Sequence, residues 1–83
     1  MSASDYQPIP CAIHSRYELA IIERHWLRLR WRDDDGLDHV DQLRPLDLET
    51  RSGEEFLIAE HPDHGRERIR LDRIVDFSVE KQP

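Results

Sequence analysis

Cysteine and long apolar runs are both scarce in this sequence. Cys11 is the sole cysteine among 83 residues, so the chain forms no internal disulfide. No apolar run approaches the length that crosses a bilayer, and the first ten residues, MSASDYQPIP, lack the basic start and apolar core of a signal peptide. We therefore expect a soluble, cytoplasmic protein.

Glycine is also rare, which limits the chemistry that loops can support. Gly36, Gly53 and Gly65 each fall in a predicted turn, and no glycine-rich phosphate loop exists. A chain of 83 residues forms one small domain with a modest core and no two-domain cleft. Cys11, His14, Ser15 and Ser78 are the candidate catalytic side chains, and no oxyanion loop accompanies them. We expect no enzymatic activity.

Lysine is nearly absent, so the positive charge is almost entirely arginine. Lys81 is the single lysine among 12 basic residues, and 18 acidic residues outweigh them to give a formal net charge of -6. This balance repels polyanions, whereas sequence-independent nucleic-acid binding needs the opposite sign. Because the guanidinium fork pairs well with carboxylates, we expect the arginines to form ion pairs within the protein or with a protein partner.

The N-terminal third combines an arm and a helix. Residues 1–10 carry two prolines and no periodicity, which predicts an extended arm. Apolar residues then recur at helical spacing, and Ser15 with Glu18 matches the Ser-x-x-Glu capping box. The sequence therefore predicts a helix over 15–24.

The hydrophobic period changes to two in residues 25–32, HWLRLRWR, which predicts a strand. One face carries Leu27, Leu29 and Trp31, and the other carries Arg28, Arg30 and Arg32. The Asp-Asp-Asp-Gly that follows predicts a turn. A four-residue loop would place Leu29 opposite Val40 and Arg28 opposite Asp41, and a shift of two residues would place Asp41 opposite Arg30.

Three further strands are predicted at 54–60, 66–71 and 74–79, followed by a polar tail at 80–83. A four-residue loop between the first two would pair Ile58 with Ile69 and Phe56 with Leu71 on an apolar face. The predicted fold class is α+β, mostly β: one helix followed by five short antiparallel strands. Strands at this spacing are typical of a small barrel, and barrel closure hides the sheet edges.

Two patterns resemble metal sites only in part. The acidic run 33–36 lacks the alternate spacing of a calcium-binding EF-hand, and the downstream glutamate is misplaced. Cys11-x-x-His14 and His61-x-x-His64 form a weaker pattern than the paired cysteines of structural zinc sites. We expect no metal and no cofactor, with Cys11 as a small apolar plug and the histidines at the surface.

Acidic residues are spread through the predicted helix and strands, and most belong to a solvated, ion-paired surface. They include Glu18, Glu23, Asp38, Asp41, Asp47 and Glu49. Together such residues imitate a phosphate backbone toward a nucleic-acid-binding protein and steer its approach.

Three segments together resemble one known family. They are YQPIPC at 6–11, YELA at 17–20 and RIRLDRIVDFS at 68–78. Similar segments occur in the Rof (YaeO-type) Rho-binding antiterminators, which also have an Asp-Gly hairpin like that at Asp35 and Gly36. The resemblance extends from Tyr6 to Phe77. One departure lies at the helix start, where the family often carries acids and a tyrosine and this chain has AIHS at 12–15.

The resemblance implies a fold, a partner and a site. The fold would be Sm-like, with the arm at 1–10, the domain at 11–79 and the tail at 80–83. The partner would be the bacterial transcription termination factor Rho, bound on its RNA-binding surface so that transcripts fail to load. The candidate partner-binding residues are then Glu18 and Glu23 of the acidic helical face, with Asp5 and Tyr17.

A second interpretation starts from the aromatic and arginine content of WLRLRWR. Exposed aromatic rings stack on bases and arginines pair with phosphates in single-stranded RNA binders. An Sm-like RNA-binding module would use Trp26 and the arginine faces, and would need a basic patch that Asp38 and Asp41 do not neutralise. A self-associating barrel without a dedicated partner is a third alternative.

Overall fold

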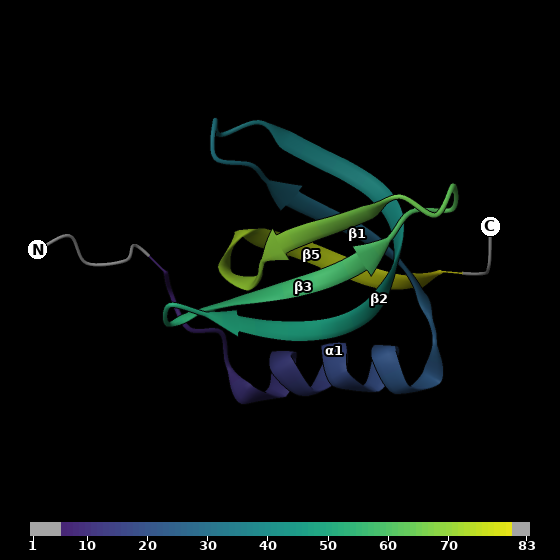
Figure 1. Cartoon of the computed structure of the whole chain (residues 1–83), viewed down its shortest axis with the longest axis horizontal. Coiled ribbons are helices and arrows are strands. Elements are labelled where there is room, and N and C mark those ends of the chain that lie inside the picture. The colour runs from purple at the N-terminus through teal and green to yellow at the C-terminus, as the bar shows by residue number, and fades with distance from the viewer. Residues whose placement is uncertain (1–5, 81–83) are drawn as a thin grey trace, which may run out of the picture.

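The computed structural model describes residues 6–80. One helix precedes five strands, and a single 3-10 turn interrupts the strands near the end (Figure 1). The elements in order are α1 (Cys11–Glu23), β1 (Trp26–Arg32), β2 (Asp38–Arg51), β3 (Glu54–Glu60), β4 (Arg66–Arg70), η1 (Leu71–Arg73) and β5 (Ile74–Glu80). The fold class predicted from the sequence, one helix followed by five antiparallel strands, is confirmed.

All five strands belong to one sheet in the order β4-β3-β2-β1-β5. β2 is the longest strand, and it pairs with β1 through its first half and with β3 through its second half. The register shifts between Pro45 and Asp47, where a bulge accommodates a proline that cannot donate to the ladder. β2 curves strongly through this region, so the sheet wraps around the core with α1 beneath it (Figure 1).

The sheet does not close into the predicted barrel. Among residues 6–80 no ladder joins β4 to β5, which form the two ends of the sheet. The sheet is therefore a strongly bent, open layer, and α1 covers one side of β2 (Figure 1).

The helix begins earlier than the sequence predicted. α1 starts at Cys11, and the carbonyl of Pro10 accepts hydrogen bonds from the backbone N–H groups of Ile13 (3.0 Å) and His14 (3.1 Å). Ser15 therefore lies inside the helix, and the predicted capping box is wrong. Proline fixes its own φ and leads readily into a helix, a signal that outweighs the Ser-x-x-Glu pattern here.

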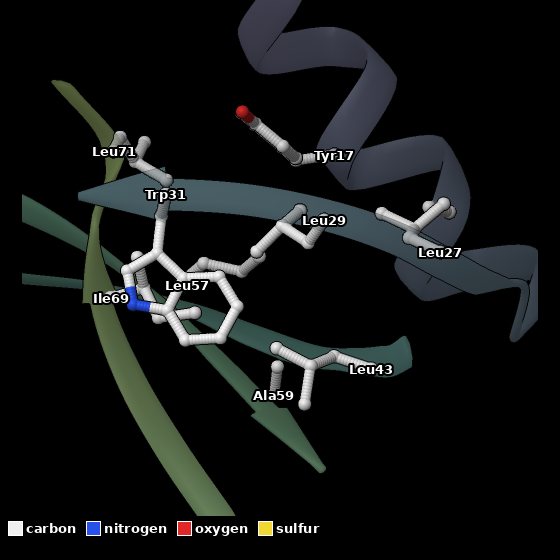
Figure 2. Packing of buried hydrophobic residues seen from close by; sticks show 10 residues of the cluster. Tyr17, Leu27, Leu29, Trp31, Leu43, Leu57, Ala59, Ile69 and Leu71 are labelled. Atoms are coloured by element: carbon white, nitrogen blue, oxygen red, sulfur yellow. The ribbon is translucent and has the colours of Figure 1, made fainter. Parts of the chain in front are cut away.

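The alternation in WLRLRWR correctly predicted which side of β1 faces the core. Leu27, Leu29 and Trp31 are buried, and the arginines between them are exposed. Figure 2 shows these side chains converging with others from α1, β2, β3, β4 and η1. The hydrophobic core cluster consists of Tyr17, Ala20, Leu27, Leu29, Trp31, Leu43, Leu57, Ala59, Ile69 and Leu71.

Both predicted hairpin registers are wrong by one residue. Leu29 lies opposite Asp41, not Val40, and Arg30 lies opposite Val40. In the later hairpin Leu57, not Ile58, pairs with Ile69. Because side chains alternate along a strand, this shift exchanges the two faces, so Leu57 and Ala59 supply the core in place of Phe56 and Ile58.

The turns explain the shift, since each hairpin loop has five residues rather than four. In the first loop the backbone N–H of Asp33 donates to the carbonyl of Leu37 at 2.9 Å. The Asp33 carboxylate also accepts from the N–H groups of Asp35 (2.9 Å) and Leu37 (3.0 Å). An aspartate that captures backbone donors in this way sets the loop length, and propensity rules do not register it.

Candidate functional site

The outward side of α1 carries acids and exposed aliphatic side chains together. Tyr17 and Ala20 are buried against the sheet and Ile21 packs beside them, whereas Glu18, Leu19, Ile22 and Glu23 are exposed. Leu19 is 54% exposed and Ile22 is 76% exposed. We call this region the helix surface, and it comprises Glu18, Leu19, Ile22 and Glu23 of α1 together with Asp47 of β2, all exposed.

Two of the four candidate partner-binding residues lie on the helix surface as predicted. The Glu18 side chain is 55% exposed and that of Glu23 is 48% exposed. The third, Asp5, lies outside the described residues. The fourth, Tyr17, does not belong to any surface.

Tyr17 is a core residue, so its assignment to partner binding is wrong. Its exposed fraction is 2%, and its ring centroid lies 4.7 Å from that of Phe77 in β5. Burial raises the pKa of the Tyr17 hydroxyl far above its ordinary value. The helix turns this position toward the sheet because Tyr17 and Ala20 occupy the same face at a spacing of three residues. Tyr17 therefore fixes the helix on the sheet rather than contacting a partner.

A second acid, Glu55, lies close to Glu18, and no local sequence pattern predicts this proximity. His14 lies between them, with Nδ1 3.3 Å from Glu18 Oε1 and Nε2 3.0 Å from Glu55 Oε1. Glu55 comes from β3, far along the chain, and the hydroxyl of Tyr6 donates to its Oε2 at 3.3 Å. The resulting arrangement brings the arm, α1 and β3 to one place beside the helix surface.

The hydroxyl of the arm residue Tyr6, which lies beside Glu55, has a raised pKa. Partial burial and the neighbouring Glu55 carboxylate together raise the pKa of Tyr6 to about 12. The hydroxyl keeps its proton at neutral pH, as an ordinary tyrosine does, and is a hydrogen-bond donor to Glu55.

The arginine face of β1 is paired with acids, although not with the acid that the sequence suggested. Arg30 Nη2 lies 3.0 Å from Asp76 Oδ2, and Arg32 Nε lies 3.0 Å from Asp38 Oδ1. The predicted neighbour Asp41 lies opposite Leu29 instead. The acidic partner therefore comes from β5 as well as β2, a pairing that only the sheet order reveals.

Trp26, the candidate stacking residue of the RNA-binding interpretation, already has a cation beside its ring. The Arg44 guanidinium carbon lies 5.5 Å from the ring centroid, and Arg44 also pairs with Glu60 at 2.8 Å. A base that stacked on the same face of this ring would have to displace Arg44.

The histidines and the cysteine do not form a metal centre. No group of three or more His, Cys, Asp or Glu side chains within residues 6–80 is arranged to hold a metal ion. Cys11 is exposed, so the prediction that it plugs the core is wrong. Cys11 lies in the first turn of α1, ahead of Tyr17 and Ala20, the two helix residues that are buried.

Among the described residues, no helix has the length and apolar character needed to cross a membrane.

Comparison with known proteins identifies the family. The chain is 37% identical over 73 residues to protein rof of Escherichia coli strain K12 and, to the same degree, to protein rof of Shigella flexneri. Each match covers 88% of this chain and 81% of the relative. The chain belongs to the Rof family. No family model matches the sequence.

A solved structure supports the fold independently of the Rof relatives. Proteasome accessory factor B/C (PafBC) of Arthrobacter aurescens superposes with a TM-score of 0.76 at 23% identity. The match covers 95% of this chain and 13% of that one. At this identity the likeness shows a shared fold and nothing about function.

The two outermost Rof-like motifs meet in space. The backbone N–H of Gln7, in the arm, donates to Asp72 Oδ2 at 3.0 Å, and Arg70 donates to both oxygens of the same carboxylate at 2.6 and 2.8 Å. Burial by itself would raise the pKa of Asp72, but the hydrogen bonds from Arg70 and Gln7 hold it below its usual value. Asp72 thus ties the arm to the end of β4.

Proposed function

We propose that this Rof-family protein binds the transcription termination factor Rho through the helix surface and prevents RNA from loading, without catalysing a reaction. Membership of the Rof family, established by 37% identity over 88% of the chain, is the observation that carries the proposal. The motifs shared with Rho-binding antiterminators supply the partner. The protein would act in the bacterial cytoplasm and would need no cofactor.

Electrostatics supports an acidic protein as a ligand for an RNA-binding surface. The formal net charge is -6, and the helix surface presents the carboxylates of Glu18, Glu23 and Asp47. A surface built to bind RNA is positively charged, so it attracts such a face over several ångströms and accelerates the encounter. RNA and this protein would then compete for the same cations.

The test is a competition between the protein and RNA for Rho. Purified protein is added to Rho carrying a labelled C-rich RNA, and fluorescence anisotropy follows release of the RNA. We expect release at low salt, and weaker release as ionic strength rises, because exposed charges are screened. If an excess of protein releases no RNA at low salt, the proposal is wrong.

Glu18→Arg tests the contribution of the helix surface. The reversal puts a cation opposite the cations of Rho, so we expect displacement to weaken about tenfold or more, equivalent to ~1.4 kcal/mol or more. Asp35→Arg is the matched control, because it makes the same charge change in the exposed β1–β2 turn, away from α1. Equal effects of the two variants would mean that only net charge matters and that Glu18 makes no contact.

The RNA-binding alternative is weakened by the pairing of Arg30 with Asp76 and of Arg32 with Asp38. A gel-shift assay with single-stranded RNA and no Rho separates the two functions. We expect no shift at physiological salt, and a clear shift would favour the RNA-binding module.

A further inference from the structure

We propose that the groove between α1 and β2 receives an aliphatic side chain of the partner, next to a lysine or arginine of that partner. This inference rests on the proposed function, because it takes the partner to be Rho. It adds an apolar contact to an interaction that has so far been explained by charge alone.

Most of the side chains that line the groove are apolar. It is lined by Glu18, Ile21, Ile22, Asp47 and Leu48, and its volume is about 230 Å³. Since one water occupies ~30 Å³ in the liquid, this space accepts a whole side chain. Ile22 is the most exposed large apolar residue of the described chain, at 76%, and Leu19 continues the apolar surface along α1. Covering these side chains would remove apolar area from water.

Two acids flank the groove from different elements. Glu18 belongs to α1 and Asp47 to β2, so each of the two elements contributes one carboxylate to the lining. Asp47 Oδ1 accepts a hydrogen bond from the backbone N–H of Leu48 at 2.9 Å, and the Asp47 side chain is exposed to solvent. An aliphatic residue adjacent to a lysine or arginine matches this arrangement in both polarity and charge.

The same acids disfavour other occupants. A nucleic acid would bring phosphates against Glu18 and Asp47, which repels it. Two copies of this chain joined groove to groove would bring the acids of both copies together across a two-fold axis. A protein surface with basic and aliphatic side chains avoids both of these repulsions.

The apolar contact and the acids make separable contributions to binding kinetics. Charges at the rim of an interface mainly affect the association rate, and buried apolar contacts mainly affect the dissociation rate. Binding of the full chain to immobilised Rho is therefore measured by biolayer interferometry. The salt concentrations are about 50, 150 and 400 mM, because the screening of charges changes strongly over this range.

We expect Ile22→Ser to raise the dissociation rate about tenfold at every salt concentration, with the association rate nearly unchanged. Ile22→Leu should restore the wild-type rate, because it keeps the apolar volume. Leu37→Ser is the matched control, because Leu37 is also exposed (62%) but lies in the β1–β2 loop. Circular dichroism melts verify that all three variants fold.

The outcomes separate this inference from the proposed function. Wild-type binding to Rho with an unchanged dissociation rate for Ile22→Ser overturns the groove and leaves the proposed function intact. An equal effect of Leu37→Ser also overturns the groove. Absence of wild-type binding to Rho overturns both. If sizing chromatography shows a wild-type dimer that Ile22→Ser dissociates, a second copy occupies the groove and the inference is wrong.

Discussion

Individual side chains in this protein derive their roles from neighbours distant in sequence. His14 is the clearest case, since it lies between one carboxylate from its own helix and another from β3. The Rof-family chain described here has a histidine that brings two acids together, so the acidic character is supplied by Glu18 and Glu55.

His39, next to the β1–β2 turn, makes the stability of the fold depend on pH. His39 Nε2 lies 2.7 Å from Asp33 Oδ2, and this hydrogen bond raises the pKa of His39 and lowers the pKa of Asp33. The raised histidine pKa stabilises the fold below about pH 6.5, and the benefit is lost as pH rises through the folded value. The lowered aspartate pKa stabilises it above about pH 4, and the benefit is lost on acidification.

The pair therefore contributes most between about pH 4 and 6.5. We expect His39→Gln to lower the melting temperature more at pH 5.5 than at pH 8.5, as measured by thermal denaturation. His64→Gln is the control, because the His64 side chain is 87% exposed and lies 3.9 Å from its nearest acid. An identical loss at both pH values for His39→Gln would contradict the prediction.

The C-terminal end of α1 has a backbone conformation that costs conformational free energy. Arg24 ends the helix in the left-handed region, with φ 56° and ψ 41°, and its N–H bonds to the carbonyls of Ala20 and Ile21. A side chain in this conformation costs ~1–2 kcal/mol, whereas glycine adopts it without strain.

Arg24→Gly should therefore stabilise the protein. Glycine loses ~0.5–1 kcal/mol through its greater freedom when unfolded, so the expected net gain in free energy of unfolding is ~0.5–1 kcal/mol. Urea denaturation measures it. Arg28→Gly, in the middle of β1, is the opposite control and should destabilise the protein. A loss of stability in Arg24→Gly would mean that the arginine side chain makes a stabilising contact.

The Asp72 carboxylate is one of two that bind the arm, the other being Glu55 through Tyr6. Asp72 accepts the backbone N–H of Gln7 and both donors of Arg70, and its side chain is 7% exposed. Asp72→Asn keeps the shape but removes the charge, so we expect a loss of about 2 kcal/mol in free energy of unfolding.

Faster cleavage of the arm by a protease should accompany this loss. Asp35→Asn, at an exposed position, is the control and should leave both measurements unchanged. If Asp72→Asn accelerated no cleavage, the Gln7 hydrogen bond would be unnecessary for holding the arm.

For the whole molecule, the sequence predicted the strands more reliably than their pairing. The alternation of leucine and arginine in β1 located the core face, because burial of one face imposes a period of two. The registers failed because aspartate side chains lengthened both hairpin loops by one residue. Asp63 in the second loop accepts the N–H of Gly65 at 3.0 Å, as Asp33 does for its own neighbours in the first.

Some residues of the candidate site follow from local sequence patterns, and others depend on contacts between segments that are distant in the sequence. The exposure of Glu18 and Glu23 was predictable, because charged side chains of an amphipathic helix lie away from the core. Their contact with a partner stays a prediction. Tyr17 was misplaced because its assignment followed the family resemblance, whereas its spacing of three residues from Ala20 puts both on the buried face of α1. Glu55 and the groove beside Asp47 depend on how β2 and β3 pass over α1, which becomes known only from the fold.

The position of β5 in the sheet has a consequence for biosynthesis. β1 lies between β2 and β5, with Trp26 opposite Glu80 at one end of the ladder. While the ribosome makes the chain, β1 and β2 emerge early, but one edge of β1 stays unpaired until β5 has left the exit tunnel. The exposed edge and its leucines are open to other chains in that interval. The sheet is consequently completed only after β5, the last strand of this fold, has emerged.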